Sequence, residues 1–181
     1  NYMFEYEITA DVMAMFYKLT QEKPAYESVV ASGLNACTIH HMKNSSTIDK
    51  TKPLLLDIGA QVDHYSADIT RTLLPEGNAR IAEVFDAVSD LHKQALSMVK
   101  PGIKFIDYER AMVKYYAEKL QQLGLITDPL EKHVRKYVPH ATSHFLGLDA
   151  HDAGDYYQEF KAGMVITVEP GVYIKNVGGC R

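Results

Sequence analysis

Two apolar segments of this sequence end in a carboxylate, and this combination restricts what the chain can fold into. Residues 54–56 are three leucines that lead directly into Asp57, and residues 164–168 lead into Glu169. Short continuous apolar segments of this kind are typical of buried strands. An acid at the buried end of a strand carries a desolvation cost of several kcal/mol unless it is paired or binds a cation. We therefore expect these acids to meet positive charge.

Two further residues fit the same interpretation. Asp68 follows Asp57 after a short excursion and lies at the start of residues 67–74, a strand candidate rich in β-branched side chains. His144 follows a serine in a histidine- and glycine-rich part of the chain. Three carboxylates and one imidazole suit Mn²⁺, Co²⁺, Zn²⁺ or Fe²⁺ rather than a structural zinc held by cysteines. Two metals bridged by a carboxylate would be one way to activate water near neutral pH.

Each of these residues also has an ordinary structural explanation. An aspartate at the end of a strand is more often a cap or turn residue, and a single histidine is more often a packed side chain than a ligand. Arg71 could pair with one of the acids, whereas no surplus of lysine or arginine accompanies Glu169. Spacing alone therefore leaves both a metal site and plain structural roles open.

Charge and composition exclude several other classes of protein. The formal net charge of −4 and a pI near 6.1 provide no basic face for nucleic acid or for anionic lipid. No apolar segment approaches the roughly 20 residues that a membrane-spanning helix needs. Two cysteines are too few for a disulfide framework, which predicts a reducing compartment and a cytoplasmic location.

Periodicity predicts a mixture of helices and short strands in one domain that covers residues 1–181. Apolar residues at helical spacing predict helices over residues 5–19, 81–98 and 106–123. Strands are predicted over residues 28–32, 36–40, 54–58, 67–74, 164–168 and 171–174. This order predicts an α/β or α+β layer in which helices cover one sheet. Because the chain begins with Asn1 and ends at Arg181 without an obvious stop, we expect it to be part of something longer.

Six motifs follow one another along the chain, in residues 5–8, 32–40, 57–59, 67–72, 143–152 and 168–173. Together they resemble the proline-specific metallopeptidases of the pita-bread fold (peptidase family M24), and among these the Xaa-Pro aminopeptidase family most and prolidase next. The resemblance implies an α+β fold with a curved, mostly antiparallel sheet covered by helices, here truncated at the C-terminus. It also implies a partial catalytic domain, without the family's N-terminal domain and C-terminal end.

The resemblance assigns the four residues above to a dinuclear metal site. It implies that Asp57 binds the first metal, that Asp68 bridges both, and that His144 and Glu169 hold the second. Glu169 would also take a proton from the attacking water. The cofactors would be two divalent ions, with Mn²⁺ favoured and Co²⁺ or Zn²⁺ as alternatives.

Five other residues match positions around the family's active site. His40 and His151 match histidines that assist proton transfer and stabilise the tetrahedral intermediate. His140 matches a histidine near the bound substrate, and Tyr156 and Arg181 match positions near the substrate pocket.

The resemblance predicts hydrolysis of the bond between an N-terminal residue and a following proline. The partner would be a peptide with proline in second position, and the longer protein would be a homo-oligomer. Alternatives are an Xaa-Pro dipeptidase (prolidase) and a non-catalytic peptide-binding module. Two departures stand out: Ala141 replaces the family's glycine, and the fifth ligand, a bridging glutamate, would lie two residues beyond Arg181. We therefore expect the activity of the longer protein, and poor metal binding and no activity of these 181 residues alone.

Overall fold

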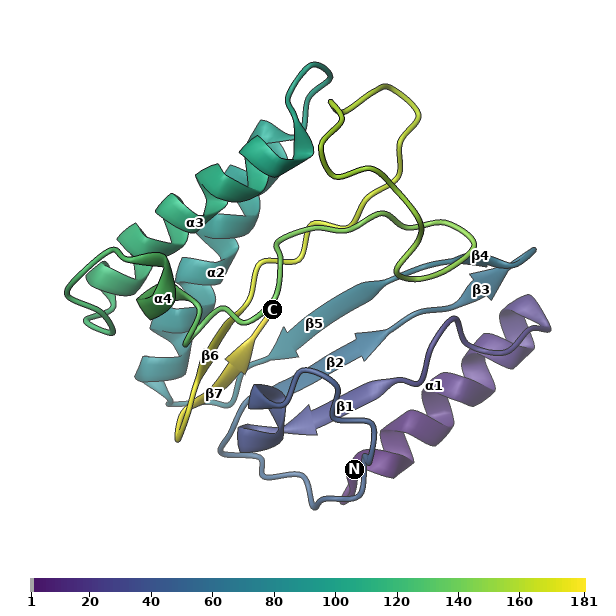
Figure 1. Ribbon diagram of the computed structural model, residues 1–181. Helices are drawn as coiled ribbons and strands as arrows, with labels where there is room; N and C mark the ends of the chain where they lie inside the picture. Colours follow the sequence, from purple (N-terminus) through teal and green to yellow (C-terminus); the bar gives the residue numbers. More distant parts are fainter. Residues whose placement is uncertain (1) are drawn as a thin grey trace.

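Three antiparallel strands form the sheet that carries the first two acids. The computed structural model describes residues 2–181, and its central sheet has the order β1 (Val29–Ser32), β2 (Leu54–Ile58) and β5 (Ile69–Leu73) (Figure 1). In the β2–β5 register, Asp57 pairs with Thr70. The sequence predicted β2 with these bounds because its apolar residues form one unbroken segment. Asp57 therefore lies near the end of a central strand, as expected.

A short hairpin connects β2 to β5 and returns the chain. It consists of β3 (Gln61–Val62) and β4 (Tyr65–Ser66), which pair antiparallel. Asp63 and His64 form its turn with φ of 50° and 67°, a left-handed conformation that aspartate tolerates better than most residues. The segment between Asp57 and Asp68 is thus a hairpin, which reverses the direction of the chain so that Asp68 directly precedes β5.

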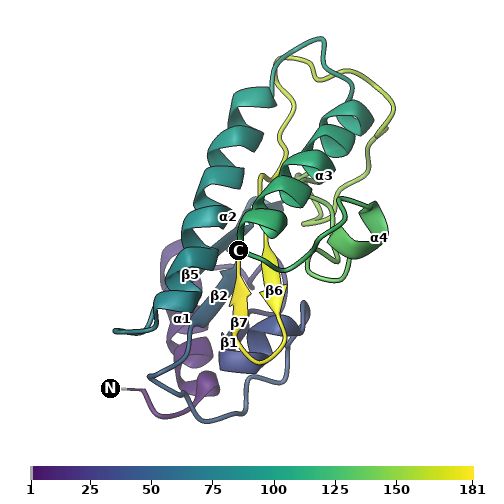
Figure 2. The same cartoon turned by 90° about the vertical axis from the view of Figure 1, so that its left-hand side faces the viewer.

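Four helices lie outside this sheet. They are α1 (Glu5–Thr20), α2 (Ala79–Met98), α3 (Phe105–Gln122) and the short α4 (Glu131–Val134). Figures 1 and 2 show α2 and α3 side by side, and in Figure 1 α1 lies next to β1, at the other edge of the sheet. The three long helices agree with the prediction to within about two residues at each end, because their apolar residues recur at helical spacing.

The main core lies between α2, α3 and the C-terminal strands. Apolar side chains from one face of α2 and one face of α3 are almost fully buried against each other. The buried members of this core include Ile81, Val84, Leu91, Phe105, Tyr108, Met112, Leu120, Phe145, Val172 and Cys180. Since α3 is fixed by this packing, it provides a rigid support for the loop that follows α4.

The 3-10 helix η1 (Gly33–Cys37) replaces one of the predicted strands. Residues 36–40 were expected to form a strand, and that prediction is wrong because Gly33 turns the chain with φ of 58° and the helix follows at once. The carbonyl oxygen of Ala36 lies so close to Gly179 that a Cβ there would approach it to 2.5 Å. Packing against the C-terminal hairpin thus outweighs the local strand propensity.

The C-terminal third contains little regular structure. Its strands are β6 (Val172–Ile174) and β7 (Gly178–Cys180), which form a hairpin. Residues 164–168 were expected to form a buried strand, and this is wrong: only Ile166 makes a bridge, to Phe145, and Val165 is 58% exposed. The segment is held instead by single hydrogen bonds to the loop that carries His144.

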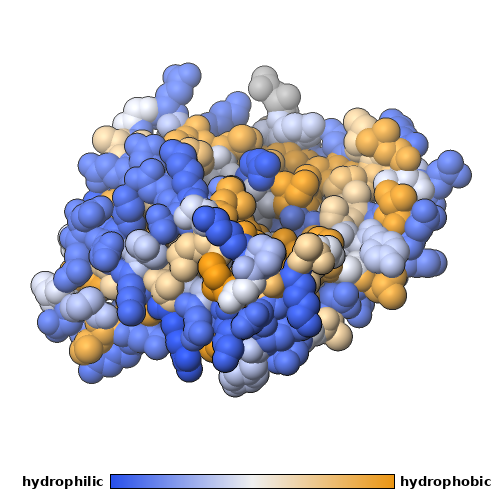
Figure 3. Space-filling model, turned by 90° about the horizontal axis from the view of Figure 1, so that it is seen from above, coloured by the Kyte–Doolittle hydropathy of each residue, from blue (hydrophilic) through white to orange (hydrophobic). Residues whose placement is uncertain are grey.

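The surface is mixed in character. Hydrophilic side chains cover most of the helical side in the view from above, and hydrophobic ones are interspersed toward the other side (Figure 3). None of the helices formed by residues 2–181 combines the length and the hydrophobicity that a membrane crossing requires.

Candidate metal centre

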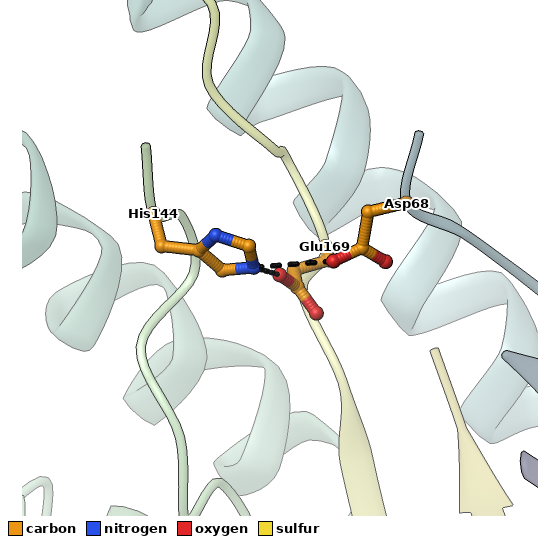
Figure 4. Close-up of side chains that lie close together, drawn as sticks. All are labelled: Asp68, His144 and Glu169. Carbon is orange, nitrogen blue, oxygen red and sulfur yellow. Dashed lines mark ion pairs between the residues drawn. The ribbon is translucent and has the colours of Figure 1, made fainter. Parts of the chain in front are cut away.

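Three of the four predicted ligands meet at one point (Figure 4). Asp68, His144 and Glu169 each offer a ligand atom, and these atoms lie within 4.8 Å of one another. The Nε2 atom of His144 is 2.8 Å from Oε1 of Glu169 and 3.4 Å from Oδ2 of Asp68. Their side chains are 11–16% exposed, so they are largely withdrawn from water but still reachable.

Thr167 joins the two segments that carry His144 and Glu169. Its hydroxyl accepts a hydrogen bond from the backbone N–H of His144 at 3.0 Å and donates one to Oε1 of Glu169 at 2.9 Å. The backbone N–H of Glu169 donates to the carbonyl of Thr142 at 2.8 Å. These contacts place both side chains on one side of paired, extended segments, although neither segment is a regular strand.

A hydrogen bond to the backbone carbonyl of Phe145 orients the ring of His144. Its Nδ1 atom lies 2.9 Å from the carbonyl oxygen of Phe145, and because a carbonyl only accepts, Nδ1 is the donor. Burial lowers the pKa of His144, but the hydrogen bonds to Asp68 and Glu169 outweigh it and raise the pKa to about 10. Because Nδ1 carries the proton that it donates to Phe145, Nε2 is the atom that a cation would bind once the ring is neutral.

The same interactions keep the acids ionised. Burial raises the pKa of Asp68, but hydrogen bonds from His144 and Tyr26 outweigh it, and the net pKa is lowered. Burial also raises the pKa of Glu169, while His144 and the Arg181 guanidinium lower it below its usual range. Both carboxylates thus present negative charge at neutral pH.

Tyr26 connects the two aspartates. Its hydroxyl lies 2.7 Å from Oδ1 of Asp57 and 3.0 Å from Oδ1 of Asp68. Gly59 makes this possible, because a Cβ at that position would lie 2.5 Å from the Tyr26 ring and 2.1 Å from the carbonyl oxygen of Ala67. Sequence reasoning missed Tyr26, which is one of 12 tyrosines with no local feature that distinguishes it.

Arg181 provides the positive charge that the sequence left unidentified. Its guanidinium donates to Asp57, and its Nη1 atom is 3.6 Å from Oε2 of Glu169. Arg71, which could have paired with one of the acids, donates instead to the backbone carbonyl of Thr70. Arg181 had been expected near a substrate pocket, and it lies directly against two acids of the site.

The donor set fits a divalent cation. Asp57, Asp68 and Glu169 bring three carboxylates together, and the Arg181 guanidinium and His144 oppose their charge. Oxygen donors with one imidazole suit Mn²⁺, Co²⁺ or Zn²⁺. Within residues 2–181 the group that is close enough to share one ion has three members, and Asp57 joins it through Tyr26 and Arg181 rather than directly.

Two of the predicted histidines lie at this centre or beside it. The ring of His151 packs edge-on against that of His144, with the centroids 4.3 Å apart. His140 lies 2.8 Å from the hydroxyl of Tyr173 and 2.7 Å from the carbonyl of Ala141, and burial lowers the pKa of its ring.

The remaining predicted residues lie further out. His40 is exposed on the loop after η1, and no hydrogen bond or ion pair joins it to the three clustered residues in the part of the chain described. Tyr156 packs on the rings of Phe105 and Phe145, with centroids 4.7 and 5.2 Å apart, and is 39% exposed.

A cavity opens beside the acids. Its volume is about 340 Å³, and it lies between β5, α2 and residues 167–170. Asp68, Glu169 and Arg181 form its charged wall, and apolar side chains of α2 such as Phe85 and Val88 face them. A pocket of this size next to a cluster of ionised groups is typical of a ligand site.

Comparison with known proteins relates the whole chain to one family of enzymes. The model of metallopeptidase family M24 matches residues 2–181. The Xaa-Pro aminopeptidase of Haemophilus influenzae is 33% identical over 96% of this chain and 43% of its own length. Xaa-Pro aminopeptidase 3 of Rattus norvegicus is 40% identical over 83% of this chain and 31% of its own length. The chain thus spans less than half the length of these relatives.

Solved structures agree with this relationship. Aminopeptidase PepP of Pseudomonas aeruginosa superposes with a TM-score of 0.90 at 31% identity, over 99% of this chain and 46% of that one. Proline aminopeptidase P II of Yersinia pestis gives a TM-score of 0.90 at 29% identity, over 99% and 46%. The predicted α+β pita-bread fold with antiparallel sheets is confirmed.

Proposed function

Because the chain belongs to metallopeptidase family M24, we propose that it forms part of the catalytic domain of a peptidase that cleaves an N-terminal residue from a following proline. The observation that carries this proposal is the meeting of Asp68, His144 and Glu169 within 4.8 Å. The relatives at 32–40% identity are named Xaa-Pro aminopeptidases, which favours this activity over that of a dipeptidase.

Four residues would hold the cofactor in this proposal. Asp57, Asp68, His144 and Glu169 would bind two divalent ions, with Mn²⁺ favoured and Asp68 between them. The ions would lower the pKa of water and polarise the scissile carbonyl. The Tyr26 hydroxyl, which lies between the two aspartates, supports a shared role for them.

Glu169 would take the proton of the attacking water. Its carboxylate is kept ionised by His144 and Arg181 and is oriented by the Thr167 hydroxyl at 2.9 Å. A general base has to be charged and correctly oriented, and the contacts to His144, Arg181 and Thr167 support both properties for Glu169.

Histidines would stabilise the oxyanion and protonate the leaving proline nitrogen. An Xaa-Pro bond has no N–H, so recognition cannot rely on one. His151, which packs on His144, would donate to the developing oxyanion or to the leaving proline nitrogen. His40 would assist it, and His140 and Tyr156 would contact the peptide. A homo-oligomeric assembly and a cytoplasmic location stay predictions.

A side-by-side assay tests the activity. The 181-residue chain and any longer protein that contains it are incubated with Arg-Pro-Pro and with the dipeptide Arg-Pro, with and without a chelator. The Haemophilus influenzae relative serves as the positive control. We expect release of arginine from the tripeptide by the longer protein, and its loss with chelator. Cleavage that resists the chelator would refute the proposal, and cleavage of the dipeptide alone would favour prolidase activity.

A further inference from the structure

The peptide segment just before His144 is held by a carboxylate of α3. Glu109 accepts a hydrogen bond from the backbone N–H of Thr142 at 3.0 Å through Oε2, and one from the backbone N–H of Ser143 at 2.9 Å through Oε1. Both carboxylate oxygens are therefore used on two successive amides. This is the bidentate arrangement that an anion makes with neighbouring backbone donors.

The surroundings make these two hydrogen bonds hard to replace. Thr142 and Ser143 are each only 1% exposed, so water cannot easily take over their N–H groups. The neighbouring Tyr108 hydroxyl lies 2.8 Å from Oγ of Ser143 and attaches the same segment to the same helix. A buried amide that loses its partner carries the full desolvation cost of the unpaired group.

The segment also lies between two halves of the site. On one side α3 holds it through Glu109, and on the other the N–H of Glu169 donates to the carbonyl of Thr142. His144 follows immediately, and its Nε2 atom faces Asp68 and Glu169. A shift of this peptide away from α3 would therefore move the imidazole relative to both carboxylates.

We propose that Glu109 is a positioning residue for the metal centre: its carboxylate fixes the Thr142–Ser143 peptide on α3 and thereby sets the place of the His144 imidazole against Asp68 and Glu169. This inference rests on the proposed metal-dependent function. Glu109 itself touches neither a ligand side chain nor the cavity, so sequence spacing does not identify it. Its effect on the metal passes entirely through the backbone of the loop.

The test compares variants of the 181-residue chain by their Co²⁺ affinity and by the visible absorption spectrum of the bound Co²⁺. Glu109→Ala removes both acceptors, and Glu109→Gln keeps one oxygen and places an NH₂ group against the other amide. Leu120→Ala is the matched control, since Leu120 is fully buried on the same helix and its loss destabilises the core without touching the loop.

We expect Glu109→Ala to weaken Co²⁺ binding at least about tenfold and to change the spectrum, since partners that orient metal ligands commonly have effects of this size. Glu109→Gln should be intermediate, and Leu120→Ala should lower the melting temperature with unchanged affinity and spectrum. Wild-type affinity and spectrum in Glu109→Ala would overturn the proposal, as would equal weakening by Leu120→Ala. If Glu109→Ala does not fold, Glu109→Gln decides on the same criteria.

A second readout separates this inference from the proposed function. The NMR signals of the His144 imidazole are recorded in the metal-free chain and its variants. A wild-type chain that binds no Co²⁺ would count against metal binding by these 181 residues alone, while the imidazole signals still report on positioning. Signals that move in Glu109→Ala and Glu109→Gln but not in Leu120→Ala support the role of Glu109, and signals that stay in place refute it.

Discussion

The guanidinium of Arg181 donates a hydrogen bond to the carboxylate of Asp57, which precedes it by 124 residues. Their side chains are 6% and 11% exposed, so this is a largely buried ion pair. The same guanidinium lies 3.6 Å from Glu169. Two of the carboxylates proposed to bind metal are thus paired with an internal cation. It follows that Arg181 and a divalent ion compete for the same negative charge.

Arg181→Met should reveal this competition. We expect the metal-free variant to lose roughly 3 kcal/mol of unfolding free energy, because buried carboxylates lose their partner. Its Mn²⁺ affinity should rise, because the ion no longer competes with the guanidinium. Urea unfolding and calorimetric titration measure the two effects. Arg71→Met is the control, since Arg71 donates to the backbone carbonyl of the neighbouring Thr70. Weaker Mn²⁺ binding in Arg181→Met would contradict the competition.

Tyr26→Phe tests the hydroxyl between the two aspartates. The variant keeps the ring and removes the donor that lies 2.7 Å from Asp57 and 3.0 Å from Asp68. We expect Mn²⁺ affinity to fall about tenfold, because the carboxylates lose a partner that orients them. Tyr17→Phe, on the exposed side of α1, is the matched control and should bind as the wild type does. Equal affinities for all three proteins would show that the hydroxyl has no part in binding.

Gly59→Ala tests the close approach that allows Tyr26 to reach the acids. The added Cβ would lie 2.1 Å from the carbonyl oxygen of Ala67 and 2.5 Å from the Tyr26 ring. We expect a loss of roughly 2 kcal/mol or more in unfolding free energy, together with weaker metal binding. Gly77→Ala meets open space but has φ of 75°, so its cost should be about 1 kcal/mol with metal binding unchanged. Equal effects of the two substitutions on metal binding would argue against the role of Gly59.

Glu5 makes the stability of the fold depend on pH. It is fully buried at the start of α1 and accepts hydrogen bonds from Ser32, Asn35, His41 and Ser46. Burial alone raises the pKa of Glu5, but these hydrogen bonds outweigh it and lower the pKa below the ordinary 4.5. A lowered pKa in the folded state stabilises the protein above the unfolded value, and this contribution is lost as pH falls through the folded value.

Glu5→Gln should therefore remove part of the acid sensitivity. We expect the variant to be less stable by about 1–3 kcal/mol at neutral pH, because buried donors lose a charged partner. The difference from the wild type should shrink as pH falls below 4.5. Melting temperatures across this range measure it, with the exposed Glu118→Gln as control. A difference that stays constant down to the lowest pH would refute the assignment.

The spacing of apolar residues along the sequence predicted the helices and the central strand. β2 and α2 follow from an unbroken apolar segment and from a helical stripe, respectively; α2 buries most of its stripe, whereas β2 buries only Leu55 of its three leucines. Asp68, His144 and Glu169 were expected to meet a cation, and they do converge. Residues 36–40 failed as a strand because packing of η1 on β7 is a tertiary effect that propensity does not contain.

Residues that act across long sequence separations could not be identified in this way. Tyr26 reaches acids 31 and 42 residues away, and Glu109 holds a loop 33 residues further on. No hydrophobic period or sequence motif links such positions, because the tertiary packing of the chain brings them together. The pairing of Arg181 with Asp57 was missed for the same reason, and Arg71, the neighbour in sequence, was considered instead.

Whether Asp68 holds metal is measured by a Mn²⁺ titration of a longer protein that contains these 181 residues, together with its Asp68→Asn and Asp63→Asn variants, followed by electron paramagnetic resonance. Asp63→Asn is the matched control, because Asp63 lies in the hairpin turn and asparagine tolerates its φ of 50°. The prediction is Mn²⁺ binding by the wild type and by Asp63→Asn, approaching roughly two ions per chain at saturation, and loss of most of that binding in Asp68→Asn. Undiminished binding by Asp68→Asn, or no binding by the wild type at millimolar Mn²⁺, would contradict it.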